Sequence, residues 1–207
     1  MIKPQYYWCP HGHTGQQHPA CYRKYVSGED KVAYIDIETS NLNSDFGVIY
    51  TYVIKDSDGN IISGKLRKSD FNNHYIDKRL VKELVEHLKN YTTVVGYYST
   101  NFDMPWIRSH AMKYNIPFPE YGTMRHIDLY YVVKYKMKLS RNRLENATKF
   151  LGIKGKSHIN PDYWIHAAAG DERSINKILE HNKWDVIILE KLHKRLMPYM
   201  SNTKKSI

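Results

Sequence analysis

Carboxylate side chains in three separated motifs are the strongest chemical signal in this chain. The first motif is a strand-like apolar run that contains Asp36 and Glu38, the second ends at Asp103, and the third places His181 before Asp185. A carboxylate inside an apolar strand needs a cationic partner, because an isolated charge is costly to remove from water. Several such carboxylates in one domain indicate a site for hard divalent cations, which prefer oxygen ligands.

The spacing within each motif allows these side chains to converge. Alternate residues of a strand point to the same face, so Asp36 and Glu38 can approach one ion. Residues four apart on a helix lie one turn above each other, so His181 and Asp185 share a face. Apolar residues at helical spacing, Ile178, Ile188, Leu192 and Leu196, continue that face. A polar pair within such a stripe suits either a catalytic helix or a buried structural ion pair.

The elements that must position these residues follow from hydrophobic periodicity. The pattern predicts a mixed α/β sheet flanked by helices. Asp58-Gly59 is a strong hairpin signal between two of the strands. Strands are expected over 31–38, 46–55, 60–65, 92–96 and 125–129, helices over 77–90 and 105–114, and a largely helical remainder. We expect a small N-terminal module over 1–30, a main domain over 31–197 and a C-terminal tail over 198–207.

At its acidic motifs the chain resembles the ribonuclease H-like 3′–5′ exonucleases of the DEDD superfamily, in particular the proofreading exonuclease domain of family B DNA polymerases. The resemblance spans 31–197 and implies a ribonuclease H-like, mixed five-stranded sheet. It also implies a metal-dependent 3′–5′ exonuclease that acts on DNA or RNA. The matching segments read Asp36-Ile-Glu38, Phe102-Asp103-Met-Pro105, His126-Ile-Asp-Leu-Tyr130, Leu139-Ser-Arg-Asn-Arg-Leu144 and His181-Asn-Lys-Trp-Asp185.

The same resemblance implies a role for each residue in a mechanism with two Mg²⁺ or Mn²⁺ ions. Asp36 would bridge the ions, Glu38 and Asp185 would complete the ligation of one, and Asp103 would hold the other. His181 would orient or deprotonate the attacking water, although its spacing from the last Asp is that of the tyrosine subgroup of the superfamily. The product would be a nucleoside 5′-monophosphate released from a 3′ end.

Further polar residues are candidates for substrate contact. Tyr98 and Asn101 lie just before Asp103, and Lys156 lies between a glycine and a serine, where a lysine could meet phosphate. Asp128 could point into the same cleft, but a helix N-terminal cap is the preferred interpretation. Three arginines, Arg108, Arg141 and Arg143, are candidate contacts to the nucleic-acid backbone.

Charge and composition favour a polyanionic partner. The net charge is +10 and the sequence pI about 9.4. Four Trp and 18 Tyr supply flat faces on which unpaired bases could stack. We therefore expect nucleic acid as the partner, as a single strand or a frayed 3′ end. A structure-selective endonuclease on the same fold and a non-catalytic nucleic-acid-binding adaptor remain the alternatives.

The N-terminal module contains a second chemical signal. Both cysteines of the chain, Cys9 and Cys21, lie within a short segment with His11, His13 and His18. Cys and His are the ligands of tetrahedral Zn²⁺, and so short a segment could take its folding energy from the metal. The pattern predicts one structural zinc site made by Cys9, His18, Cys21 and either His13 or His11. A disulfide and two free thiols are the alternatives.

No apolar run approaches the roughly 20 residues that a membrane-spanning helix requires. The N-terminus does not have the pattern of a signal peptide. We therefore expect an intracellular, cytoplasmic protein without a membrane partner.

Overall fold

A computed structural model describes residues 2–9, 12–28, 30–120, 123–155 and 159–200. One five-stranded sheet with the order β3-β2-β1-β4-β5 forms its centre. β1 (Val32–Thr39) lies in the middle, antiparallel to β2 (Ile49–Asp56) and parallel to β4 (Thr93–Gly96). β3 (Ile61–Lys65) and β5 (Arg125–Asp128) form the two edges. The predicted mixed sheet is confirmed.

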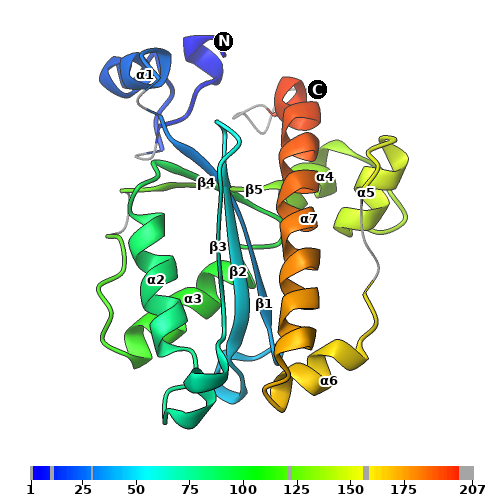
Figure 1. Ribbon diagram of the computed structural model, residues 1–207. Coiled ribbons are helices and arrows are strands. Elements are labelled where there is room, and N and C mark those ends of the chain that lie inside the picture. Colours follow the sequence, from blue (N-terminus) through cyan, green and yellow to red (C-terminus); the bar gives the residue numbers. More distant parts are fainter. Residues whose placement is uncertain (1, 10–11, 29, 121–122, 156–158, 201–207) are drawn as a thin grey trace.

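Helices cover both faces of this sheet (Figure 1). α2 (Lys78–Leu88) and α3 (Asp103–Lys113) lie on one face, and the long helix α7 (Glu172–Leu196) crosses the other. The remaining elements are α1 (Pro19–Val26), α4 (Leu129–Lys136), α5 (Leu144–Phe150), α6 (Asp162–Ala168) and the short 3₁₀ turns η1 (Pro4–Tyr6), η2 (Ser44–Phe46), η3 (Lys68–Asn72) and η4 (Met197–Tyr199).

The side chains of β1 alternate between the two faces of the sheet and pack into two separate hydrophobic clusters. Ala33, Ile35 and Ile37 pack into the cluster that contains the buried residues of α2 and α3. Tyr34 belongs instead to the cluster formed with α4, α5 and the C-terminal half of α7. Because side chains alternate along a strand, Asp36 and Glu38 follow Tyr34 onto the face that α7 covers. The core therefore orients the first acidic motif toward the helix that carries the third.

Local structure sets where β2 and α7 begin. The second strand begins at Ile49 rather than at 46, because Ser44–Phe46 forms a 3₁₀ turn. α7 begins at Glu172, where the side chain of Asp171 accepts a hydrogen bond of 2.8 Å from the Ser174 N–H as an N-cap. His181 therefore lies within the helix, where tertiary contacts hold it, and not near its start.

Candidate active site

Side chains from β1 and α7 form a cluster of titratable groups on the face of the sheet that α7 covers. His181 Nε2 lies 3.5 Å from Asp185 Oδ2 and 3.8 Å from Glu38 Oε1. One donor atom from each of these three residues lies within 4.8 Å of the others. Asp36 is half-buried and precedes Glu38 on the same face of β1. The predicted convergence of the first and third motifs is therefore present.

Asp103 reaches the edge of β1 because β4 is short. Pairing between β1 and β4 ends at Tyr34, so the rest of that edge of β1 is left without a neighbouring strand. Asp103, the first residue of α3, fills the gap and accepts a hydrogen bond of 3.0 Å from the Ile37 N–H. Burial raises the pKa of Asp103 to about 7, although the Ile37 N–H opposes the shift. The second motif thus reaches β1 between Asp36 and Glu38.

The loop before α3 is held in place by Asp128. Its carboxylate accepts hydrogen bonds from the backbone N–H groups of Tyr98 at 2.7 Å, Thr100 at 2.9 Å and Tyr130 at 3.0 Å. The last of these confirms the predicted N-cap, here of α4. The other two were not predicted, and they hold Tyr98 at a φ of 61°, in the left-handed region that a bulky residue rarely adopts. Strain of this kind is typical of functional sites.

The other predicted substrate-contact residues are spread over the surface. Tyr98 is exposed, and the Asn101 side-chain amide donates a hydrogen bond of 2.6 Å to the Tyr131 hydroxyl. Arg108 is exposed on α3 with its guanidinium carbon 5.6 Å from the centre of the Phe118 ring. Arg141 and Arg143 are exposed before α5. Lys156 and His11 lie outside the described residues.

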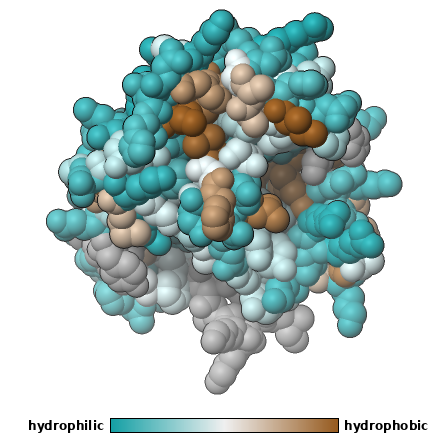
Figure 2. Space-filling model, turned by 90° about the horizontal axis from the view of Figure 1, so that it is seen from below, coloured by the Kyte–Doolittle hydropathy of each residue, from teal (hydrophilic) through white to brown (hydrophobic). Residues whose placement is uncertain are grey.

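Sequence reasoning missed several aromatic and apolar neighbours of the acids. The Trp164 ring lies edge-on to His181, with centroids 6.3 Å apart. Leu42 and Phe46, in the loop after Glu38, are 80% and 78% exposed. Seen from the end at which β1 finishes, apolar side chains gather among polar ones (Figure 2). Two large apolar residues in a polar loop were the signal that could have indicated this surface.

The donor set of the cluster fits a divalent metal ion. Glu38, Asp185 and His181 offer the oxygen and nitrogen ligands that Mg²⁺ and Mn²⁺ accept, and Asp36 lies on the same face of β1. The side chains of Glu38, His181 and Asp185 are between 12% and 17% exposed, so each can be reached from solvent. Like charges crowded in this way repel one another unless a cation is shared among them.

The N-terminal module with α1 lies at the opposite end of β1 from the acids (Figure 1). Donor atoms of Cys9, His13 and His18 lie within 4.8 Å of one another. Cys21 Sγ lies 3.5 Å from His18 Nδ1. Neither Cys9 nor Cys21 is part of a disulfide in the described residues.

Fold and site together define a ribonuclease H-like protein: a mixed five-stranded sheet with acids on its central strand and on the flanking helices. A sequence profile of the RNase_H superfamily matches residues 33–197. The chain belongs to this superfamily. The resemblance inferred from the motifs is confirmed, and the membership supports a nuclease.

Known proteins that are similar to this chain include two DNA polymerases. A curated DNA polymerase of Archaeoglobus fulgidus is 25% identical over 150 residues, a match that covers 63% of this chain and 19% of the polymerase. The solved family B DNA polymerase of Pyrobaculum calidifontis superposes with a TM-score of 0.67 at 20% identity, over 82% of this chain and 25% of that one. The chain thus spans about a fifth of the curated relative and a quarter of the solved structure.

Every helix within the described residues is too short or too polar to serve as a membrane span.

Proposed function

We propose that this protein is a metal-dependent 3′–5′ exonuclease that releases nucleoside 5′-monophosphates from single-stranded or frayed DNA or RNA. The observation that carries the proposal is the meeting of three acidic motifs around β1. Glu38 and Asp185 approach His181 on one side, and Asp103 accepts the Ile37 N–H on the other. This arrangement supports a site that binds cations and a phosphodiester, because carboxylates alone would repel phosphate.

Asp36, Glu38, Asp103 and Asp185 would hold two Mg²⁺ or Mn²⁺ ions. Bound there, the ions would supply Lewis-acid stabilisation of the charge that develops on phosphate and would lower the pKa of a bound water. As the oxygen of the attacking water bonds to phosphorus, the bond from phosphorus to the 3′ oxygen of the preceding nucleotide breaks. The leaving oxygen then takes a proton from solvent.

His181 is the residue proposed to receive the proton of the attacking water. Its Nε2 faces the carboxylates of Glu38 and Asp185, which stabilise an imidazole that has become positively charged. The neighbouring Trp164 ring limits the directions that the imidazole can take. If His181 only orients the water, an amide side chain at this position could do the same work.

Exposed side chains beside the acids are proposed to hold the substrate strand. Leu42 and Phe46 follow Glu38, and Tyr98 precedes Asp103; each presents an apolar surface to solvent. Such surfaces suit unpaired bases, whose stacking does not depend on sequence. Asn101 and Lys156 are the proposed polar contacts. The net charge of +10 supports attraction of the polyanion.

We also propose how the chain is divided into domains. Residues 31–197 would form the catalytic domain, since the superfamily profile covers 33–197. Residues 1–30 would form a separate module, and 198–207 a tail.

The test is hydrolysis of 5′-labelled and 3′-labelled single-stranded DNA and RNA with Mn²⁺, beside the Asp36→Ala variant. We expect the 5′-labelled strand to shorten stepwise from its 3′ end, and the variant to leave it intact. Internal cuts would replace the exonuclease with the structure-selective endonuclease. Binding without cleavage under every metal tried would favour the adaptor. Equal cleavage by Asp36→Ala would contradict a site built on these acids.

A further inference from the structure

The N-terminal module has too small a core to hold itself together. Among residues 2–9, 12–19 and 21–28, burial is confined to Tyr7, Cys9 and Gly15. The Tyr7 ring stacks on Tyr25 with centroids 4.8 Å apart, and the Tyr22 ring lies near both. Segments below about 40 residues usually need a disulfide, a metal or a partner for stability. The module therefore needs a cross-link of some kind.

Two of its possible ligands lie on one tight turn. The Cys9 N–H donates to the His13 carbonyl at 2.9 Å, and the Gly12 N–H donates to the Cys9 carbonyl at 3.0 Å. Gly12 has a φ of +78°, which a residue without a β-carbon adopts at little cost. The turn brings Cys9 and His13 close to one another.

The other two ligands lie on the first turn of α1. His18 is the N-cap residue, and Cys21 follows three positions later, so their side chains share one side of the helix. Cys9 Sγ lies 3.4 Å and Cys21 Sγ 3.5 Å from His18 Nδ1. In a tetrahedral site with Zn–S bonds of about 2.3 Å and Zn–N bonds of about 2.0 Å, the edge between sulfur and nitrogen is about 3.5 Å. Both observed distances match that edge.

We propose that Cys9, His13, His18 and Cys21 bind one Zn²⁺ ion in a closed structural site. Four protein ligands leave no coordination position for a substrate, so the ion is structural rather than catalytic. Binding deprotonates both thiols, and the two protons pass to solvent. The ion joins the turn to the helix and replaces the apolar core that the module lacks.

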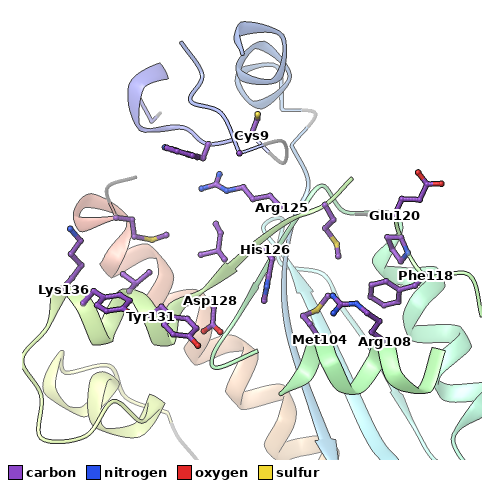
Figure 3. A pocket seen from close by; sticks show the side chains of 18 of the residues that line it. Cys9, Met104, Arg108, Phe118, Glu120, Arg125, His126, Asp128, Tyr131 and Lys136 are labelled. Carbon is purple, nitrogen blue, oxygen red and sulfur yellow. The ribbon is translucent and has the colours of Figure 1, made fainter. Parts of the chain in front are cut away.

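The same ion would fix one wall of a cavity of about 1100 Å³. Trp8, Cys9 and Gly12 line this cavity from the module. Met104 and Arg108 of α3 line it from the main domain, and Cys9 lies across the cavity from them (Figure 3). The Arg125 guanidinium of β5 lies 5.8 Å from the centre of the Tyr7 ring, which connects module and sheet. The metal site thus shapes a cavity that Met104, the residue after Asp103, also lines.

The first test is the metal content of the full chain, purified without chelators and with its thiols reduced. We expect about one zinc per chain, as in a closed four-ligand site. Cys9→Ser and His18→Gln should each lose the ion, while His166→Gln, a change of an exposed histidine on α6, should retain it. Cobalt(II) added to the metal-free chain should give the visible absorption of a tetrahedral thiolate site. Zinc retained in both ligand variants, or lost equally from all three, would overturn the proposal.

A second measurement addresses misfolding of the ligand variants by using the unaltered chain. Alkylation of Cys9 and Cys21 should be slow in the zinc-bound chain and much faster after a chelator removes the ion. Zinc added back should restore the protection. Alkylation rates that do not change when the chelator is added would contradict the site. A measured mass that lacks both thiol hydrogens would reveal a disulfide and would contradict it too. Neither readout depends on hydrolysis, so the exonuclease proposal stands or fails separately.

Discussion

Two clusters of histidine and carboxylate on opposite faces of the sheet invite comparison. In the first, Asp77 accepts hydrogen bonds from the Ile49 N–H at 2.8 Å and from the Tyr114 hydroxyl, and its Oδ2 lies 2.7 Å from His110 Nδ1. His110 Nε2 lies 2.8 Å from the Ser44 carbonyl. The side chains of His110 and Asp77 are 1% and 0% exposed. Short contacts surround every ring nitrogen and carboxylate oxygen of this pair.

In the second cluster, His181 lies 3.5 Å and 3.8 Å from two carboxylate oxygens, and water can reach all three residues. Similar chemical groups therefore occur once as a buried short-range network that joins α2, α3 and β2, and once as a set of side chains that solvent reaches. Buried polar groups stabilise a fold when all their hydrogen bonds are made. Acids that solvent can reach are open to a ligand. The difference in solvent access assigns the stabilising role to the Asp77 cluster and the chemical role to the His181 cluster.

We expect the largest effect when an acid of the His181 cluster is removed. Asp185→Asn keeps the shape of the side chain but removes its charge. We expect hydrolysis to fall by at least about a thousandfold, because metal stabilisation of the transition state is worth several kcal/mol. Steady-state rates with Mn²⁺ measure this, and strand binding should persist. Glu180→Gln, an exposed change on the same helix, is the control and should keep the full rate.

Replacement of the histidine of each cluster should separate chemistry from stability. His181→Gln should slow turnover by about 10²–10⁴, the range for loss of a general base, and should flatten the acid limb of the pH–rate profile. His110→Gln should leave turnover per folded molecule unchanged, since its partners belong to the framework. An unslowed His181→Gln enzyme with an unchanged pH profile would assign His181 to water orientation alone.

Removal of charge from the short-range network should have the opposite signature. Asp77→Asn removes the charge and replaces one accepting oxygen with an NH₂ group, so the side chain can no longer accept from His110, the Ile49 N–H and the Tyr114 hydroxyl together. We expect a cost of about 3–5 kcal/mol, as for other broken buried pairs. Urea unfolding monitored by circular dichroism gives this value, and hydrolysis per folded molecule should remain near normal. A loss below about 1 kcal/mol, the size of an exposed pair, would show that the network is not structural.

A third histidine, His193, should make the stability of the fold depend on pH. Burial lowers the pKa of His193 to about 4, and its Nδ1 lies 3.1 Å from the Tyr34 hydroxyl. The unfolded chain, with an ordinary pKa near 6.5, binds more protons between these values, so stability should fall as pH drops from about 6.5 to about 4. The loss amounts to about 3 kcal/mol. Urea unfolding across this range measures it, and His193→Gln should show a flatter dependence.

Much of the fold and part of the site could be predicted from local pattern. Alternation in β1 indicated that Asp36 and Glu38 share a face, and helical spacing indicated the same for His181 and Asp185; the structure has both arrangements. These features depend on the strand and helix periods alone. Asp58-Gly59 likewise marked the turn between β2 and β3.

The contacts that assemble the site depend on element lengths, which the pattern does not set. Asp103 reaches the Ile37 N–H because β4 ends before β1 does. Asp128 acts as more than a helix cap because the loop before α3 folds back over the end of β5. The exposure of Phe46 follows from the 3₁₀ turn where a strand was expected. Each of these is a tertiary result that overrides a local preference.

Because β4 ends before β1 does, one backbone amide of β1 can report metal binding. The amide hydrogen of Ile37 is donated to the Asp103 carboxylate, whereas β1 pairs with β4 as far as Tyr34. Whatever draws the Asp103 carboxylate toward a cation weakens that bond and lets the hydrogen exchange with deuterium from solvent. A single backbone resonance, followed by NMR as metal is titrated, would then report occupancy of the site in a catalytically silent chain.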